Sequence, residues 1–337
     1  MGRLLCEPKG SRFIANFREL FTDVDYNETF NFTEVHQAAV GLLPMTVDEV
    51  LNHSSFDSNV DARDKEGKTP LYWAARKGDT TAVEQLIRAG ADVNARDIGK
   101  DTPLGAASRS CSATCMQILI DAGALVENKD CFGYTALANV GKWQDQVVFA
   151  ETLIQAGASP DALDIHGATA FARSARYNHC DIGAYLLDHG ADIDKPDSEG
   201  NPPIFEAATA DAAEYLVLLL AKGARQDVKN GAGCSLIHIL ATHASAKTFQ
   251  RLADSKLGMI DMEARDRKGR TALELINDRV LVSAELRAAF YACVQPSLRR
   301  ASVRSRIADR RRRYQRAWFI VPMLCIFLVL IRCFARR

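Results

Sequence analysis

The sequence lacks the motifs with which most enzyme families hold a cofactor or activate a reacting group. It contains no G-x-S-x-G nucleophile turn, no P-loop, no H-E-x-x-H zinc motif and no G-x-G-x-x-G after an expected strand. The adjacent residues His179 and Cys180 could suggest a nucleophile, but they fall at a turn between helices in the repeat described below, which favours a structural role. We therefore expect no enzyme activity, no catalytic residue, no cofactor and no small-molecule substrate.

Cysteine patterns typical of metal sites are also missing. The nine cysteines are scattered, and none forms a C-x-x-C pair or a Cys/His set with zinc-binding spacing. This distribution favours reduced thiols that are buried as small hydrophobic side chains. Residues 1–17 contain no apolar run long enough for a secretory signal peptide. We expect no metal site and no translocation of the N-terminal part.

Charge is balanced in total but not along the chain. The protein has 42 basic and 42 acidic residues, and its 47% hydrophobic and 25% charged content is typical of a folded chain. Residues 299–337 contain twelve arginines and one acid, Asp309, so this segment carries +11 and the rest of the chain −11. An acidic folded body with a basic tail is predicted.

A segment of about 33 residues recurs through most of the sequence. Its leading residue is Asp64 in the first clear copy, and a Thr-Pro-Leu element follows at 69–71 and again at 102–104. A Gly-Ala pair closes five of the copies. At spacings of 33, 33, 34, 33, 33 and 36 residues, the leading position is repeated at Asp97, Asp130, Asp164, Asp197, Asn230 and Asp266.

Each part of this unit has a physical reason. The hydroxyl of Thr69 can cap a helix that begins at the following proline, where a missing N–H costs nothing. Val83, Leu86 and Ile87 form an apolar stripe on a second helix, and Gly90 suits the left-handed end of that helix. A single unit cannot bury its apolar face, so stacked helix pairs must supply the core.

The segment from Asp64 to Ala95 resembles the ankyrin repeat, whose pattern D-x-x-G-x-T-P-L-H-x-A-A-x-x-G…L-L-x-x-G-A-D-V-N-A is nearly intact there. The resemblance covers about Phe32 to Arg279 and implies an all-α ankyrin-repeat solenoid of helix-turn-helix units with hairpin fingers. A degenerate repeat at residues 32–42 also looks like those of ankyrin proteins from filamentous fungi. We predict an N-terminal extension at 1–30, about seven repeats plus a degenerate N-terminal cap at 31–280, a capping helix at 281–298, an Arg-rich juxtamembrane segment at 299–316 and a transmembrane helix at 317–335.

The membrane prediction depends on the run Ala317–Ile331, which contains no charge. Its fifteen residues would span about 22 Å as a helix, and nineteen residues counted through Ala335 would span about 28 Å, close to the ~30 Å hydrocarbon core. Trp318 is expected at the interface, with Arg316 and Arg332 as flanking anchors. A buried core helix is the alternative. The short span suits a thin membrane, and the endoplasmic reticulum or the mitochondrial outer membrane is favoured.

The arginines also predict an orientation. Nine precede the apolar run and three follow it, so the array is expected in the cytosol. The arrangement resembles tail-anchored, single-pass membrane proteins. For the Arg-rich segment, attraction to anionic lipid is favoured over folding back onto the acidic array. Nuclear targeting or nucleic-acid binding is a third interpretation, and no nucleic-acid partner is expected.

The resemblance implies that protein partners bind along the concave surface formed by the fingers and the first helices. Basic and aromatic residues, which are frequent in interface hot spots, occupy these positions in the first four repeats. The candidate partner-binding residues are Trp73, Arg76, Lys77, Arg109, Lys142, Trp143, Arg173, Arg176 and Tyr177. The alternative is that these are solvated positions that happen to be basic.

From these features we predict a membrane-anchored scaffold or adaptor for protein–protein interactions, whose groove captures acidic segments of cytosolic partners that contain aromatic residues or proline. The alternative is a soluble or nuclear regulatory ankyrin protein, such as an accessory protein of a fungal secondary-metabolite pathway.

Overall fold

The structure is a computed structural model and describes residues 30–55, 59–110, 112–144, 146–253, 255, 261–279 and 283–295. These residues form eight consecutive helix pairs. The first helices of the pairs are α3 (Glu34–Val40), α5 (Pro70–Lys77), α7 (Pro103–Ala107), α9 (Ala136–Trp143), α11 (Ala170–Arg176), α13 (Pro203–Thr209), α15 (Leu236–His243) and α17 (Ala272–Asp278). The second helices are α4 (Val47–Leu51), α6 (Thr80–Arg88), α8 (Ala113–Asp121), α10 (Val147–Gln155), α12 (Cys180–Asp188), α14 (Ala213–Ala221), α16 (Ala246–Ala253) and the helix at residues 284–295.

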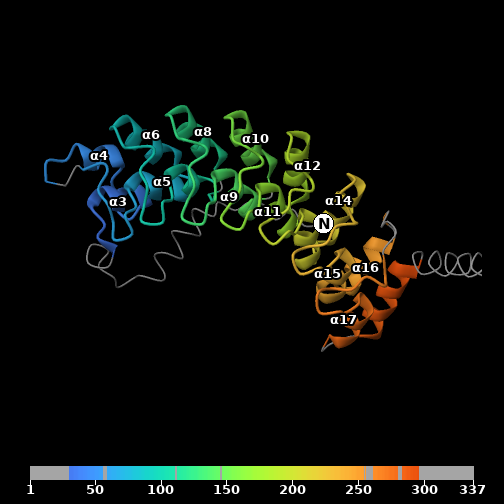
Figure 1. The fold of residues 1–337 in the computed structure, drawn as a ribbon. Coiled ribbons are helices and arrows are strands. Elements are labelled where there is room, and N and C mark those ends of the chain that lie inside the picture. The colour runs from blue at the N-terminus through green and yellow to red at the C-terminus, as the bar shows by residue number, and fades with distance from the viewer. Residues whose placement is uncertain are drawn as a thin grey trace, which may run out of the picture.

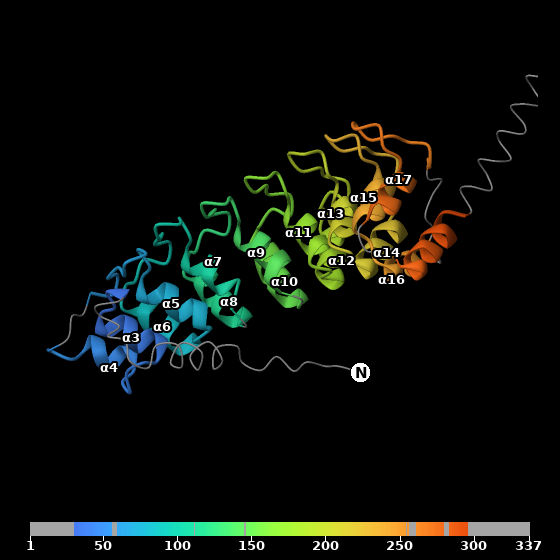
Figure 2. The same cartoon turned by 90° about the horizontal axis from the view of Figure 1, so that it is seen from below.

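The pairs stack side by side into an elongated, curved array (Figure 1). First helices pack on first helices and second helices on second helices. The second helices follow the outer curve, and the first helices follow the inner curve. The loops that join one pair to the next project to one side of the array (Figure 2). We call these loops fingers, number the pairs from α5/α6 onward as repeats 1 to 7, and call the side formed by first helices and fingers the inner surface.

Threonine hydroxyls start the first helices, as their sequence predicts. The side chains of Thr69, Thr102, Thr135 and Thr169 each accept a hydrogen bond from the backbone N–H three residues later. Gly78 ends α5 with a φ of 79°, a left-handed conformation that glycine adopts without steric cost. Caps at both ends let helices of only five to nine residues form in the array.

The leading residue of each repeat, an aspartate or in repeat 6 Asn230, closes the turn at its fingertip. Asp130 Oδ1, for example, accepts hydrogen bonds of 2.9 Å from the N–H groups of Phe132 and Tyr134. Backbone hydrogen bonds then join successive fingers, such as Ile165 N to Phe132 O at 3.1 Å and Ser198 N to His166 O at 2.9 Å. The fingers are therefore held in fixed register along the array.

One continuous apolar core runs between the helix layers. Its largest side chain is Tyr215 of α14, which is fully buried and whose hydroxyl lies 2.8 Å from Ser174 Oγ of α11. Gly183 of α12 makes room for this ring, because a Cβ there would lie 2.0 Å from the Tyr215 hydroxyl. This packing joins repeats 4 and 5.

The predicted all-α solenoid of helix pairs with projecting fingers is confirmed. Each end of the array is a full pair. In the predicted degenerate N-terminal cap, α3 is followed by α4. At the other end, α17 is followed by the helix at residues 284–295, within the region predicted to be a capping helix. Phe290 of that helix packs edge-on against Phe249 of α16, with 5.4 Å between ring centroids. The exact domain boundaries stay a prediction.

The predicted Arg-rich segment at 299–316 and transmembrane helix at 317–335, with Arg316, Trp318 and Arg332, lie outside the described residues. Within the ranges given above, no helix has the length and apolar character needed to cross a bilayer.

Candidate partner-binding surface

Four of the predicted cations occupy the same position in successive repeats. Arg76, Arg109, Lys142 and Arg176 each lie seven residues after the threonine that caps their first helix. Because the repeats stack in register, these positions form one column along the inner surface of repeats 1 to 4. The corresponding residues of repeats 5 and 6 are Thr209 and Thr242.

Arg109 is held by partners from its own repeat and from the repeat before it. It forms an ion pair with Asp101, and its Nη2 donates to the Tyr72 hydroxyl at 3.1 Å. That hydroxyl donates to Asp101 Oδ2 at 3.1 Å. Burial alone would lower the pKa of Arg109, but Asp101 and Tyr72 together outweigh it and raise the pKa above its ordinary value. Arg76 extends the network, because its Nη1 donates to the Arg109 carbonyl at 2.8 Å.

Arg173 is neutralised by the leading aspartate of its finger. Two of its nitrogens donate to the same carboxylate oxygen of Asp164, with Nε at 3.0 Å. The Asp164 side chain is fully buried, and the guanidinium lies over the Tyr134 ring at 5.3 Å. Trp73 takes the same role in repeat 1, where its Nε1 donates to Asp64 Oδ2 at 2.9 Å. Arg173 and Trp73 therefore tie a finger to the helix behind it.

The remaining predicted residues lie at the C-terminal ends of first helices, where Trp143, Arg176 and Tyr177 are exposed and Lys77 and Lys142 are half-buried. Trp143 is 52% exposed and Tyr177 is 42% exposed. The Lys142 ammonium lies 4.7 Å from the Trp143 ring centroid. Arg176 is paired with Glu206 at 3.0 Å but is 45% exposed, whereas Lys77 is paired with Asp79 at 2.9 Å and is mostly covered.

The structure thus separates the predicted residues into two groups. One group supports the inner surface by bonding within it, namely Trp73, Arg76, Lys77, Arg109 and Arg173. In the other group, Trp143, Arg176 and Tyr177 are exposed, and the half-buried Lys142 lies against the Trp143 ring. No partner is present, so the binding role of both groups stays a prediction.

Sequence reasoning missed the tips of three fingers. Ile98, Phe132 and Ile165 are 76%, 55% and 59% exposed, among the most exposed large apolar side chains in the described residues. The signal was available, because an apolar residue follows Asp97, Asp130 and Asp164 by one or two positions in a turn where polar residues are usual.

A second basic row lies at the base of the fingers. Arg63 donates to the Arg96 carbonyl at 2.7 Å, Arg96 donates to the Lys129 carbonyl at 2.5 Å, and Lys129 donates to the Leu163 carbonyl at 2.7 Å. These bonds link neighbouring repeats. Their acceptors are backbone carbonyls and not carboxylates, so the bonds do not neutralise the positive charges. At the next equivalent position, Leu163, the row ends.

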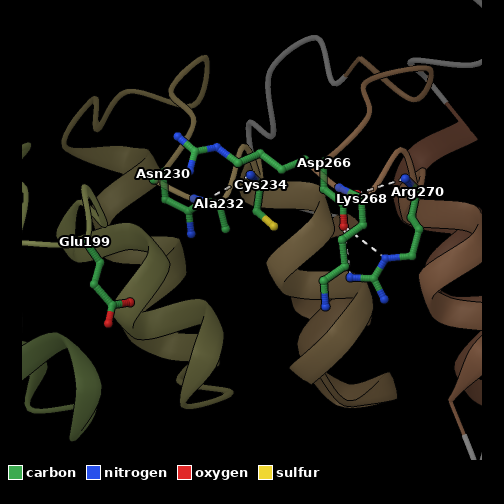
Figure 3. Close-up of a pocket in the computed structure, with 9 residues that line it drawn as sticks. Glu199, Asn230, Ala232, Cys234, Asp266, Lys268 and Arg270 are labelled. Atoms are coloured by element: carbon green, nitrogen blue, oxygen red, sulfur yellow. Dashed lines mark hydrogen bonds and ion pairs between the residues drawn. The ribbon is translucent and has the colours of Figure 1, made fainter.

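A shallow pocket lies between the fingers of repeats 5 to 7 (Figure 3). Its lining includes Glu199, Cys234 and the ion pair between Asp266 and Arg270, which has nitrogen–oxygen distances of 3.1 and 2.9 Å. Burial raises the pKa of the Cys234 thiol, so this group is not an activated nucleophile. Among the described residues, no cluster of three or more His, Cys, Asp or Glu side chains could bind a metal ion.

A family model described as ankyrin repeats (3 copies) matches residues 13–97 and 138–230, more than half of the chain. Human transient receptor potential cation channel subfamily A member 1 is 37% identical over 71 residues, which cover 21% of this chain and 6% of the channel. Ankyrin repeat-containing protein P1E11.10 of Schizosaccharomyces pombe is 27% identical over 113 residues, which cover 34% of this chain and 52% of that protein. The chain spans at most about half the length of these relatives.

The fold has a close counterpart among solved structures. The crystal structure of the human ASB11 ankyrin repeat domain matches with a TM-score of 0.59 and 24% sequence identity. The match covers 67% of this chain and 98% of that domain. At this level of identity the likeness concerns the fold.

Proposed function

Because the chain belongs to the ankyrin-repeat family, whose domains typically mediate protein–protein interactions without enzymatic activity, we propose that it is a membrane-anchored scaffold or adaptor. In this proposal, the inner surface of repeats 1 to 4 captures acidic segments of cytosolic protein partners.

The observation that carries the proposal is the column of cations on repeats 1 to 4. Arg176 is its exposed member and Lys142 is half-buried, and the two lie beside the exposed rings of Tyr177 and Trp143. Arginine, tryptophan and tyrosine are the residue types most often found as energetic centres of interfaces. The described parts of repeats 5 and 6 have threonine at the column position, so the first four repeats favour binding.

The charge of the partner follows from the way the acids of this surface are used. Asp64, Asp101 and Asp164 accept hydrogen bonds from Trp73, Tyr72 or Arg173, and two of them form ion pairs. These carboxylates therefore have little remaining capacity for a partner, whereas Lys142 is held by aromatic rings and keeps an unneutralised charge. A partner with exposed carboxylates is favoured.

Membrane attachment rests on the sequence of residues 317–335 and the nine arginines of residues 299–316. The proposal places the array in the cytosol, at the endoplasmic reticulum or the mitochondrial outer membrane. Alkaline carbonate extraction tests it, because a spanning helix keeps the protein in the membrane pellet. Release into the supernatant would favour a soluble or nuclear regulator instead.

Partner capture is tested by photo-cross-linking from two positions of similar exposure. Trp143 lies on the proposed surface at 52% exposure, and Tyr291 lies on the last helix at 44% exposure. A photoreactive phenylalanine at position 143 should cross-link protein segments rich in Asp and Glu, and the same residue at position 291 should not.

The charge requirement is tested in the same experiment. Lys142→Glu combined with Arg176→Glu should reduce cross-linking at position 143 by about tenfold or more. A matched reversal of exposed cations on second-helix ends, Arg88→Glu with Lys222→Glu, should leave cross-linking unchanged. Equal cross-linking in both double variants would contradict an electrostatic role for the inner surface.

A further inference from the structure

The fingers of repeats 2, 3 and 4 present apolar side chains at their tips. Ile98 is 76% exposed, Phe132 is 55% exposed and Ile165 is 59% exposed. The tips of the other fingers are polar, charged or small. The corresponding residues are Lys65 and Glu66, Ser198 and Glu199, Gly231 and Ala232, and Arg267 and Lys268.

These three side chains form a row because the backbone fixes the fingers in register. Cys131 N donates to Gly99 O at 2.7 Å, which joins the fingers of Ile98 and Phe132, and Ile165 N donates to Phe132 O at 3.1 Å. The Ile98 Cγ1 atom would lie 3.3 Å from a Cβ at Gly67, so its side chain lies against the preceding finger. We call Ile98, Phe132 and Ile165 the fingertip row.

The charges around the fingertip row are unevenly available. Asp97 Oδ1 and Asp130 Oδ1 accept hydrogen bonds from backbone N–H groups of their own fingers. Arg96 and Lys129 are exposed and donate to backbone carbonyls, which do not neutralise them. Lys100 is also exposed beside the first tip. The accessible charge around the row is therefore mainly positive, and the exposed Glu66 beside the first tip is paired with Lys68.

We propose that the fingertip row is a second contact for the partner of repeats 1 to 4, and that this partner is an extended acidic protein segment that also carries apolar side chains. The inference rests on the proposed function for the acidic character of the partner and adds its apolar character. Burial of exposed apolar area would supply affinity, and the surrounding lysines and arginine would select a segment with neighbouring carboxylates.

A bilayer is a less suitable occupant of this row. Anchoring at residues 317–335 follows repeat 7, whose fingertip residues are Arg267 and Lys268. If the fingers rested in a membrane, the finger next to the anchor should also carry apolar residues. The apolar tips instead lie on repeats 2 to 4, and repeats 3 and 4 also display Trp143 and Tyr177, which favours one partner that contacts both sets of residues.

The test uses the full chain in nanodiscs of zwitterionic lipid and three fluorescent peptides of equal length. The first alternates glutamate with leucine and phenylalanine, the second replaces every apolar residue by serine, and the third replaces every glutamate by lysine. Fluorescence anisotropy gives the dissociation constants, and empty nanodiscs give the background. We expect the acidic–apolar peptide to bind at least about tenfold more tightly than the acidic–serine peptide, because apolar area is buried.

Two triple variants assign that difference to its residues. Ile98→Ser, Phe132→Ser and Ile165→Ser together should abolish it, whereas the control Val148→Ser, Leu273→Ser and Tyr291→Ser should preserve it, since those side chains are exposed elsewhere. Circular dichroism checks that both variants are folded, which is expected because the replaced side chains are solvent-exposed.

The outcomes separate this inference from the proposed function. Equal binding of both acidic peptides overturns the fingertip row and leaves the acidic partner standing. Failure of both acidic peptides, or tighter binding of the lysine peptide, overturns both. Two further results would overturn the inference. Self-association of the protein that disappears in the fingertip variant would assign the row to a second copy of the chain. Binding to empty nanodiscs of anionic lipid that disappears in the fingertip variant would assign it to a membrane.

Discussion

Repeats 1 to 4 and repeats 5 to 7 share one backbone plan but differ in the side chains on their inner surface. In the first set, long side chains connect a finger to the helix behind it, as Arg173 does with Asp164. In repeats 5 and 6, Thr209 and Thr242 occupy the cation column, and their hydroxyls donate to carbonyls four residues earlier in the same helix. The same fold is therefore compatible with long cations in the column or with threonines that bond to their own helix.

Helix capping separates repeat 5 from repeats 1 to 4, whereas α17 of repeat 7 again begins with a capping threonine, Thr271. The first helices of repeats 1 to 4 begin with a threonine whose side chain accepts a backbone hydrogen bond. In repeat 5, α13 begins after Pro202 and α14 begins after Ala212, and neither residue caps through its side chain. Local stability in a repeat array depends on such local terms and on the contacts between neighbours. We expect the stability of the first four repeats to depend more on specific polar side chains than the stability of repeat 5 does.

The largest effect is expected from Arg173→Ala. The change leaves the fully buried Asp164 carboxylate without its cation, and removing one partner of a buried ion pair costs about 3 kcal/mol. Native-state hydrogen exchange should show this loss in α11 and the adjacent finger. Arg176→Ala, three residues later on the exposed side, is the control and should cost less than about 1 kcal/mol.

Arg270→Ala makes the same test in the second region. Arg270 also forms two hydrogen bonds with a leading aspartate, but its side chain is 41% exposed. Water can therefore replace part of the interaction, and the loss should be smaller than for Arg173→Ala. Equal losses would show that the two inner surfaces do not differ in this respect.

The next effect concerns the junction between the two regions. A Cβ at Gly183 would approach the buried ring of Tyr215 to 2.5 Å at Cζ, so Gly183→Ala should destabilise the array by about 2 kcal/mol through overpacking. Urea denaturation measures this loss. In a Tyr215→Ala background the same substitution should cost less, because the obstacle is gone. If Gly183→Ala cost as much stability in the Tyr215→Ala background as in the native protein, the proposed clash with the Tyr215 ring would be excluded.

Helix capping gives a smaller effect. Thr135 Oγ1 accepts a hydrogen bond of 3.2 Å from Ala138 N, and Thr135→Ala should cost about 1 kcal/mol, measured by hydrogen exchange in α9. Thr135→Ser keeps a hydroxyl at this position and should restore most of the stability. If Thr135→Ser lost as much stability as Thr135→Ala, the loss would come from packing of the threonine methyl group and not from the hydrogen bond.

The repeat pattern allowed much of this fold to be predicted, because its residues act locally. Thr69 and the leading aspartates form their caps and turns within a few residues of themselves. The short helix α4 was missed, although Thr46 and Glu49 have the spacing of a capping box and form one. Its degenerate repeat provided too little periodicity to reveal the pair.

The accessible charge could not be predicted in the same way. Arg109 and Arg176 occupy equivalent positions in the sequence, yet Arg109 is neutralised in a mostly buried network and Arg176 is 45% exposed. The difference arises from Asp101, which lies eight residues before Arg109 on the finger, where the repeat of Arg176 has Ala168. Such pairs depend on how a finger folds over its helix, which periodicity does not specify.

The smallest expected effect is a pH dependence at the N-terminal end. Burial lowers the pKa of His36 below its ordinary value of 6.5, while the hydrogen bond to the Lys68 carbonyl and the charge of Asp64 oppose this change. Because the folded pKa lies below the unfolded one, the unfolded state binds the proton more readily. Stability contributed by the neutral ring is therefore complete above about pH 6.5 and declines as the pH falls toward the folded pKa.

Proton NMR of the His36 ring should accordingly show a titration midpoint below 6.5, and hydrogen exchange in α3 should show easier opening at pH 5.5 than at pH 7.5. His36→Gln provides the control, because it removes the titrating group and should remove the difference between the two pH values. The ring also bridges Thr33 to the next repeat through Nδ1 and Nε2, so the variant itself should be less stable at both values. A pH effect that persists in His36→Gln would place its origin outside the first pair, and the N-terminal end would then rely on packing alone.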